Sequence, residues 1–530
     1  MVEMSRSIIK KTLGIGSSTL LSRFFAYIRE ILLIQFLGVG AISDAFFIAL
    51  RVPNSLRKVF AEGALSSVLV PSFIHAEQKY GKQEVNKLLT VSFLMIEALI
   101  TCLIAVICYY APFFVHQMAP GASAQSLHAS VQFLRILAPF ILLLSSSSVL
   151  AAALQASHRF LLPGLAPVIL NCLYVVALSF GLYFSWSVDA LCWSWVVAAF
   201  LNLLLHLWVC MLYKFEFRLP GAIAWKGFLQ VMLQLFPCIV SVGIGEVNFW
   251  IDSAFASYLQ SGTLSLIRTA YQLVNIPLGV IATSLSIVLL PYFSKIGNSK
   301  KELGAYLAEA IKFVIWMIVP VTFIMMISSR EIFETMFLSS KFTMEHVFQA
   351  QSNMNAYLVG LLFFALEKIL LNAFYALQST GIATGVAIAT IALNFFMNRM
   401  LIGVYGGMGL ALATSLSAGV RVALFIAILA YYFKVDFHTK DLMKMIRNYC
   451  VQLLALGSVF YSAVYTISRF IAQYSFSHDL NFGFFHVVMD THFFLHGFGF
   501  WSWFGPLSLL FFAGIYATRK AFGVSFSYLE

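Results

Sequence analysis

The sequence predicts an α-helical membrane protein with about fourteen transmembrane helices, built as two six-helix lobes and a C-terminal helix pair. First, 61% of the 530 residues are hydrophobic and only 10% are charged, whereas a soluble domain carries about 25% charged residues. Second, apolar runs of about 20 residues, enough to cross a hydrocarbon core of ~30 Å, recur along the whole chain. Third, the chain contains a weak internal repeat. These features exclude a large soluble domain.

The predicted spans follow one another with short connections, so any function must reside within the membrane. Lys and Arg gather in alternate connections, and cytoplasmic loops attract this excess, so both termini are expected on the cytoplasmic side. The span centres lie near Arg23, Arg51, Leu99, Leu143, Cys172, Val197, Ile239, Val280, Ile318, Phe363, Ile388, Leu416, Tyr461 and Leu509.

The repeat has a period of roughly 220 residues, as in transporters built from duplicated halves. "VLVPSF" at 68–73 recurs as "VLLPYF" at 288–293, and the Gly40 and Ser43 pair recurs as Gly262 and Ser265. An even number of spans separates the copies, so an axis along the membrane normal and a cavity between the lobes are expected. The predicted parts are an N-lobe at 1–220, a C-lobe at 221–436 and an accessory helix pair at 437–530.

Charged residues are concentrated in the first two spans. A charge at membrane depth costs at least about 2.5 kcal/mol unless a partner or a wet cavity relieves it. Basic residues outnumber acidic ones here, so pairing alone cannot satisfy them, and a water-filled cavity that receives an anion would. Arginine suits phosphate because its planar fork donates two parallel hydrogen bonds. Snorkelling to the headgroups, or pairing of Arg29 with Glu30, is the alternative. In the second lobe Arg268, Lys312 and Lys368 lie at membrane depth, with Glu246, Asp252 and Glu367 as candidate counter-charges.

Several motifs resemble one family. "SRFFAYIRE", "SDAFFIALRVPNSLRKVFAEGALSSVLVP" and "GTLSLIRTAYQLVNIPLGVIATSLSIVLLPYFSK" are similar to the MviN/MurJ lipid II flippases of bacteria. That family belongs to the superfamily of multidrug, oligosaccharidyl-lipid and polysaccharide exporters, and the resemblance extends over roughly residues 8–435. It implies a multi-pass protein of the bacterial inner membrane that serves peptidoglycan synthesis, and hence cell wall biogenesis and cell shape. Lipid II, an undecaprenyl pyrophosphate bearing the peptidoglycan disaccharide-pentapeptide, would move from the cytoplasmic to the periplasmic leaflet by alternating access.

The resemblance also implies a set of site residues. The family's cavity arginines match Arg23, Arg29 and Arg57, and its acidic motif positions match Asp44 and Glu62, to which structural or gating roles are assigned together with Pro53. Where the family usually has a further arginine this chain has Gln272, with Arg268 one helical turn earlier on the same face. Arg268 either replaces that contact or the contact is lost. Lys368 is the second cation expected to bind substrate in the C-lobe.

A sodium site is a further hypothesis. Asn394 and Asn398 are four residues apart and share a helix face, and Asp252 and Thr414 are candidates to complete an oxygen-only site, which suits a hard cation. The resemblance implies that relatives with such a sodium site have an aspartate in place of Asn398. A structural hydrogen-bonded cluster is the alternative. The membrane potential, about 2.3 kcal/mol per charge per 100 mV, is the other candidate driving force.

Alternative functions would require other features of the sequence. A cation-coupled drug antiporter would need carboxylates rather than arginines in the first lobe, and a flippase for another undecaprenyl-linked glycan stays open. An enzyme is not expected, because the outward loops are short and poor in acids. No CxxC pair indicates structural zinc, no cofactor beyond the driving ion is expected, and the basic residues do not cluster into a nucleic-acid surface. The expected partners are lipid II, membrane lipids and cell-wall synthesis proteins, with the chain itself a monomer.

Overall fold

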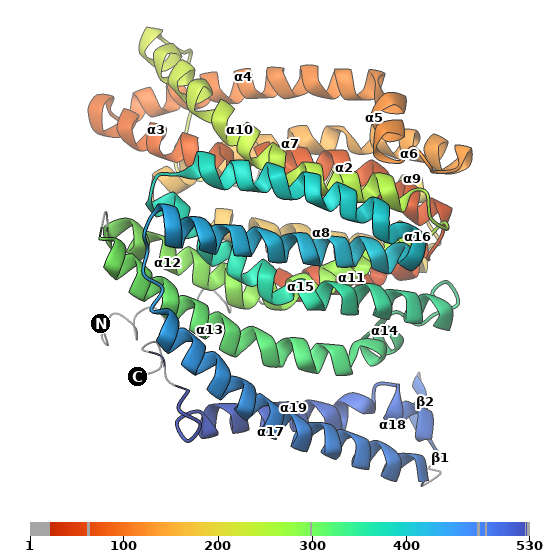
Figure 1. Ribbon diagram of the computed structural model, residues 1–530. Helices are drawn as coiled ribbons and strands as arrows, with labels where there is room; N and C mark the ends of the chain where they lie inside the picture. Colours follow the sequence, from red (N-terminus) through yellow and green to blue (C-terminus); the bar gives the residue numbers. More distant parts are fainter. Residues whose placement is uncertain are drawn as a thin grey trace. The chain divides into compact units, whose positions relative to one another are not determined.

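The computed structural model describes residues 22–60, 64–296, 299–473, 477–482, 485–524 and 526. The described chain is almost entirely helical, as predicted (Figure 1). A first helix covers residues 22–37. The other elements are α2 (Ala41–Phe60), α3 (Ala64–Tyr80), α4 (Lys82–Tyr109), α5 (Ala111–Met118), α6 (Ala124–Leu137), α7 (Pro139–Ala156), α8 (Leu161–Tyr183), α9 (Val188–Leu212), α10 (Ala222–Ala256), α11 (Thr263–Pro277), η1 (Leu278–Thr283), α12 (Ser284–Ile296), α13 (Lys300–Ile327), α14 (Ser329–Phe337), α15 (Met344–Ala376), α16 (Thr380–Ala427), η2 (Ile428–Tyr432), α17 (Thr439–Gln473), β1 (Ser477–Phe482), β2 (Phe485–Asp490), α18 (Thr491–Leu495) and α19 (Phe500–Thr518).

Membrane-spanning helices dominate the chain. Ten helices among the described residues are long and apolar enough to cross a membrane. One of these stretches, Thr380–Tyr432, has 53 residues and is interrupted at Gly406, whose φ of 53° and ψ of −130° are not helical. Glycine adopts such a conformation without the steric cost of a side chain. The first helix, the α2–α3 segment and α10 are not among the ten. The multi-pass helical fold is therefore confirmed, and the count of about fourteen spans stays a prediction.

The chain forms two compact units, called here the N-unit, Leu21–Ser265, and the C-unit, from Leu266 to Glu530. The predicted divisions at 220/221 and 436/437 came from the internal repeat and stay predictions. The packing units differ from the predicted parts in two respects: α10 packs with the N-unit, and the accessory helix pair packs with the C-unit.

Helix α10 belongs to the N-unit because its polar side chains bond to α2. Glu246 accepts hydrogen bonds from Lys58 Nζ at 2.6 Å and from Ser55 Oγ at 2.8 Å. Further along α10, Ser253 accepts a bond from Arg51 at 3.1 Å. Glu246 was predicted as a counter-charge for the cations of the second lobe. That assignment is wrong, because the ion pair is made with Lys58.

Small polar residues allow close packing inside the N-unit. The hydroxyls of Ser145, Ser146, Ser147 and Ser148 in α7 all donate to carbonyls three or four residues earlier in the same helix, at 2.8–2.9 Å. All four residues are buried. Bonds of this kind satisfy the hydroxyls internally, so that the neighbouring helices α3, α4 and α9 can approach α7 closely.

The C-unit is centred on α15, which packs along α16, with α13 and α12 as further neighbours. The accessory pair, α17 and α19, joins the unit through buried polar contacts. The Tyr449 hydroxyl donates to the Trp316 carbonyl of α13 at 2.7 Å. The Gln452 amide donates to the Ile515 carbonyl and to Thr518 Oγ1 of α19, both at 2.8 Å. Because such bonds are rarely replaced in lipid, they fix the register of the pair.

The α15–α16 contact gives a first testable prediction. A Cβ built at Gly360 would lie 2.5 Å from Ser415 Oγ and 2.8 Å from Ser415 Cα. Gly360→Ala is therefore expected to push the helices apart and to lower the unfolding free energy by about 1–3 kcal/mol. Gly385→Ala in α16 is the matched control, because a Cβ there meets nothing within 4 Å. Thermal unfolding of the purified protein in detergent measures both. Equal melting temperatures for the two variants would contradict the tight contact.

The loop before the last span contains the chain's small sheet. Strands β1 and β2 form an antiparallel hairpin with Ser477 opposite Asp490. Helix α18 follows, and Asp490 Oδ1 caps it by accepting from the Phe493 amide at 2.7 Å.

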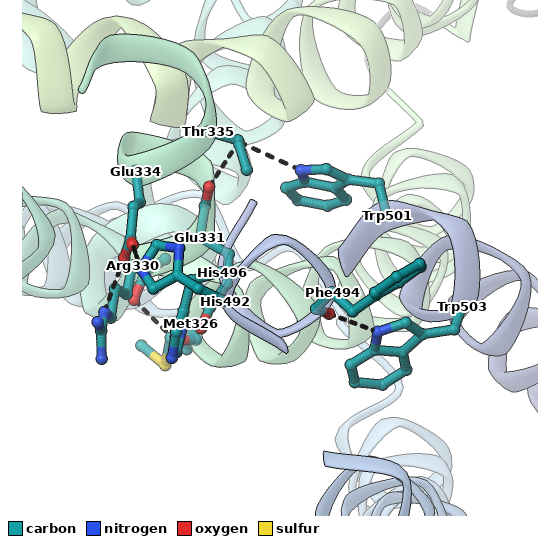
Figure 2. A network of polar contacts seen from close by, with 11 residues as sticks. Met326, Arg330, Glu331, Glu334, Thr335, His492, Phe494, His496, Trp501 and Trp503 are labelled. Atoms are coloured by element: carbon teal, nitrogen blue, oxygen red, sulfur yellow. Dashed lines mark hydrogen bonds and ion pairs between the residues drawn. The ribbon is translucent and has the colours of Figure 1, made fainter. Parts of the chain in front are cut away.

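Helix α18 contacts α14 through histidines and glutamates (Figure 2). His492 Nε2 lies 3.0 Å from Glu334 Oε1, and His496 Nδ1 lies 3.4 Å from Glu331 Oε1. Arg330 Nε also donates to Glu334, at 3.0 Å. In the described part of the chain no three His, Cys, Asp or Glu side chains are grouped to hold a metal. His492 and His496 thus join α18 to α14 through their contacts with Glu334 and Glu331.

Candidate substrate-binding site

The first helix carries two of the predicted substrate-binding residues, Arg23 and Arg29, both half-buried. Arg29 Nη1 donates to Asn171 Oδ1 of α8 at 2.9 Å. The predicted alternative, a close pair with Glu30, is present only as a longer contact of 3.8 Å between Arg29 Nη2 and Glu30 Oε2. The guanidinium of Arg29 is thus held by a neutral amide as well as by the Glu30 carboxylate, and anion binding by Arg29 stays a prediction.

Helix α2 positions Arg57 in its last turn. A cation is favoured there because the carbonyl end of a helix carries partial negative charge. Arg57 lines a cavity of about 140 Å³ inside the N-unit, formed together with residues of α3, α7, α8 and α9.

Two other cations of α2, Lys58 and Arg51, contact residues of α10. Lys58 forms the ion pair with Glu246 described above, and its ammonium lies 5.1 Å from the centroid of the Phe249 ring. Arg51 bonds to Ser253 and lies 5.5 Å from the same ring. Substrate binding by Arg23, Arg29 and Arg57 stays a prediction.

Asp44 has a clearly defined structural contact. Its Oδ2 accepts the Gly262 amide at 2.6 Å and its Oδ1 accepts the Ser265 amide at 2.9 Å. These amides lie at the start of α11, where backbone N–H groups have no partner within the helix and favour negative charge. Gly262 has a φ of +97°, and a Cβ there would lie 2.5 Å from Val39 Cγ1, so glycine is needed.

The repeat positions meet beside this cap. The Ser43 hydroxyl donates to the Gly40 carbonyl at 2.8 Å, and the Ser265 hydroxyl donates to the Gly262 carbonyl at 2.7 Å. The two hydroxyls are 3.4 Å apart. The two copies of the Gly-x-x-Ser pattern therefore make the same local turn and touch each other. The other residues assigned structural or gating roles are Pro53, buried inside α2, and Glu62, which lies outside the described residues.

The C-unit holds the remaining predicted substrate-binding residues. Arg268 and Gln272 are both half-buried in α11, and Lys368 is half-buried in α15. Glu367 was considered as a partner for Lys368, and this is wrong, because Glu367 Oε1 accepts from Arg421 Nη1 at 2.7 Å. Arg421 Nε also donates to Thr390, at 2.8 Å. Lys312, another cation of this lobe, pairs with Glu309 at 2.7 Å.

The residues suggested for sodium divide between the units. Asn394, Asn398 and Thr414 of α16 form a chain in the C-unit. The Asn398 amide donates to Asn394 Oδ1 at 2.9 Å, and the Asn394 amide lies 3.4 Å from Thr414 Oγ1. Both asparagines are fully buried. Asp252 lies in α10 of the N-unit. The chain of amides has the form of the structural alternative, since Asn394 Oδ1, a candidate cation ligand, accepts a proton donor instead.

Sequence reasoning missed Asn171 and Arg421. Asn171 interrupts an apolar stretch of α8 and Arg421 an apolar stretch of α16, and this interruption was the available signal. Their partners Arg29 and Glu367 are 142 and 54 residues away along the chain. Only the packing of the helices shows these pairs.

Comparison with known proteins shows the family of this chain. The family model described as "Lipid II flippase MurJ" matches residues 33–483. The chain belongs to the lipid II flippase MurJ family. A relative from Buchnera aphidicola subsp. Schizaphis graminum, named a probable lipid II flippase, is 30% identical over 422 residues, covering 78% of this chain and 82% of that protein. Another from Rickettsia prowazekii is 25% identical over 469 residues, 87% of this chain and 90% of that protein.

Solved structures show the same fold. A lipid II flippase in an inward closed conformation has a TM-score of 0.74 at 22% identity, covering 95% of this chain and 98% of that one. An inward-facing multidrug transporter of the MATE family has a TM-score of 0.67 at 12% identity, with 80% and 98% coverage. Family membership and fold confirm the predicted transporter class and the multi-pass membrane protein.

Proposed function

We propose that this protein moves lipid II from the cytoplasmic to the periplasmic leaflet of the bacterial inner membrane by alternating access, with both termini cytoplasmic. The observation that carries the proposal is the family match over residues 33–483. The arginines of the N-unit give it a chemical basis, because a diphosphate is the part of such a lipid that guanidinium groups bind best. The protein makes and breaks no covalent bond in this scheme, and so it acts as a transporter rather than an enzyme.

Binding begins with the diphosphate in this mechanism. Arg57 at the end of α2 and Arg29 on the first helix supply charge-assisted hydrogen bonds, with Arg23 one to two turns before Arg29. An anion at this place removes the cost of holding these charges in an apolar environment, so substrate and arginines stabilise each other. Arg268, Lys368 and Gln272 of the C-unit are proposed to contact the same substrate. Release on the far side leaves the cationic site empty.

The membrane potential is our first candidate for resetting the empty site. The inside-negative potential contributes about 2.3 kcal/mol per charge per 100 mV, which favours return of the substrate-free cationic site to the cytoplasmic side. Sodium is the second candidate, and the hydrogen-bonded asparagines of α16 argue for a weak site, since neutral amides hold sodium less firmly than a carboxylate does.

Replacing sodium by potassium therefore is expected to change lipid II transport less than twofold, whereas collapsing the potential slows it severalfold. Vesicles containing the purified protein, with imposed ion gradients, measure both. Asn398→Asp is the informative variant, because a carboxylate in this cluster is expected to introduce sodium dependence. A strict sodium requirement of the unaltered protein would assign the coupling to sodium instead.

Depletion in cells tests the proposed function. Loss of the protein is expected to reduce the lipid II that an impermeant reagent can reach at the outer surface, while total lipid II rises. A plasmid copy should restore exposure. A drug-efflux defect with normal lipid II exposure would instead indicate the cation-coupled antiporter, and a defect confined to another undecaprenyl-linked glycan would indicate a flippase for that glycan. We also propose that the protein acts as a monomer and has cell-wall synthesis proteins among its partners. A loss of lipid II exposure on depletion is consistent with this.

A further inference from the structure

The cavity beside Arg57 contains two buried groups that the mechanism above does not use. His206 and Asn202, both on α9, line it together with Ser147, Ser148 and Gln155. His206 is 1% exposed and Asn202 is 2% exposed. Helix α9 is one of the apolar spans, so these two side chains sit in an environment where unmade hydrogen bonds are costly.

The hydrogen bonding of His206 fixes which of its atoms can act. Nδ1 lies 2.8 Å from the carbonyl oxygen of Asn202. A carbonyl can only accept, so Nδ1 carries the proton and the neutral ring presents a lone pair at Nε2. Within the described residues, neither Nε2 of His206 nor Oδ1 of Asn202 has a hydrogen-bond partner. Both atoms are acceptors that require a donor.

Ser147 adds a further hydrogen-bond acceptor to the cavity wall. The hydroxyl of Ser147 donates its proton to the carbonyl of Leu143 at 2.8 Å. The Ser147 oxygen therefore offers only lone pairs to the cavity. Leaving a buried acceptor unsatisfied costs about 1–3 kcal/mol. The complementary ligand is thus a group with several O–H or N–H donors.

We propose that His206 and Asn202 form a sugar-reading subsite, which accepts hydrogen bonds from the glycan residue attached to the diphosphate. The inference rests on the proposed function, in which Arg57 of the same cavity binds the diphosphate. On one side of a diphosphate in lipid II is an isoprenoid chain, which has no donors, and on the other is a sugar, which has several. A volume of about 140 Å³ is similar to that of a cavity that holds a benzene ring, and so suits one ring or its substituents.

This subsite would select for the glycan rather than for the lipid anchor. A site built to accept particular hydrogen bonds rejects an analogue that lacks the donors, because its buried acceptors then stay unpaired. The protein should accordingly distinguish undecaprenyl diphosphate carrying its sugars from undecaprenyl diphosphate alone, and the distinction should depend on His206 and Asn202.

The test is a binding measurement on the purified full-length protein with two probes, lipid II and undecaprenyl diphosphate. His206→Phe keeps a ring of similar shape but removes the acceptor. It is expected to weaken lipid II binding about tenfold and to leave undecaprenyl diphosphate binding unchanged within twofold. Asn202→Leu should act the same way. His206→Gln, whose side-chain oxygen can replace Nε2, should retain most of the preference, and His116→Phe in α5 is the matched control on an exposed residue.

The outcomes separate this inference from the proposed function. Equal losses for both probes in His206→Phe and Asn202→Leu, or no loss for either, would overturn the sugar-reading subsite while the flippase assignment stands. If the unaltered protein binds neither probe, the proposed function fails and the subsite fails with it. Melting temperatures of the variants within a few degrees of the unaltered protein establish that the binding change is local.

Discussion

Arg57→Ala is expected to reduce binding of undecaprenyl-diphosphate lipids about a hundredfold and to abolish complementation of a depleted strain. Hydrogen bonds to charged groups contribute about 1.5–3 kcal/mol each, and a bidentate guanidinium makes two. Arg57→Lys keeps the charge but loses the planar fork, and should fall between the alanine variant and the unaltered protein. Titration of the purified protein with undecaprenyl diphosphate measures all three.

Arg135→Ala is the matched control for Arg57→Ala. Arg135 also lies in the N-unit but is exposed, and its Nε donates to the Cys108 carbonyl at 3.2 Å. Its removal should change binding less than twofold, because an exposed charge in water contributes little. Similar losses for both alanine variants would mean that overall positive charge, rather than the position of Arg57, attracts the lipid.

Asp44→Ala is expected to lower the unfolding free energy by about 3 kcal/mol and to prevent transport. Asp44 accepts two backbone amides at the start of α11, and removing this half-buried charged acceptor leaves both donors unsatisfied. Asp44→Asn retains one acceptor and should lose about half as much. Urea or thermal unfolding of the purified variants measures stability, and complementation of the depleted strain measures function.

The control for Asp44 is Asp189→Ala. The Asp189 carboxylate is half-buried and accepts from the side-chain amide of Gln132 at 2.8 Å, a neutral donor whose loss should cost less than about 1 kcal/mol. If Asp44→Ala melts at the same temperature as Asp189→Ala yet fails to complement, Asp44 acts in the transport cycle rather than as a structural cap. If it complements fully, the cap is dispensable.

The sequence predicted the helical membrane fold well because lipid imposes simple rules. Every backbone group must be satisfied within its own helix, so apolar length alone identifies a span. The Gly40–Ser43 and Gly262–Ser265 repeat was also readable, and the structure gives it a physical meaning in two equivalent turns. The hairpin formed by β1 and β2 was not foreseen, since it lies in a short connection where polar histidines interrupt aromatic residues.

The site was predicted only in part because charge placement can be read from a sequence and pairing cannot. Arg29 and Arg57 were identifiable as costly charges in apolar helices. The partners Glu246 for Lys58 and Arg421 for Glu367 depend on how helices pack, and the reading of Glu246 followed the repeat boundary instead of the packing. His206 and Asn202 escaped notice because single polar residues in an apolar helix are as compatible with a satisfied core position as with a ligand.

Transport in a defined system tests the central claim most directly. The purified protein is reconstituted into vesicles with fluorescent lipid II, and an impermeant reductant reports which molecules reach the outer leaflet. The unaltered protein should make nearly all of the label accessible, and the double variant Arg29→Ala, Arg57→Ala should leave about half protected, as in vesicles without protein. Full accessibility with the double variant would contradict a cationic site that binds the diphosphate.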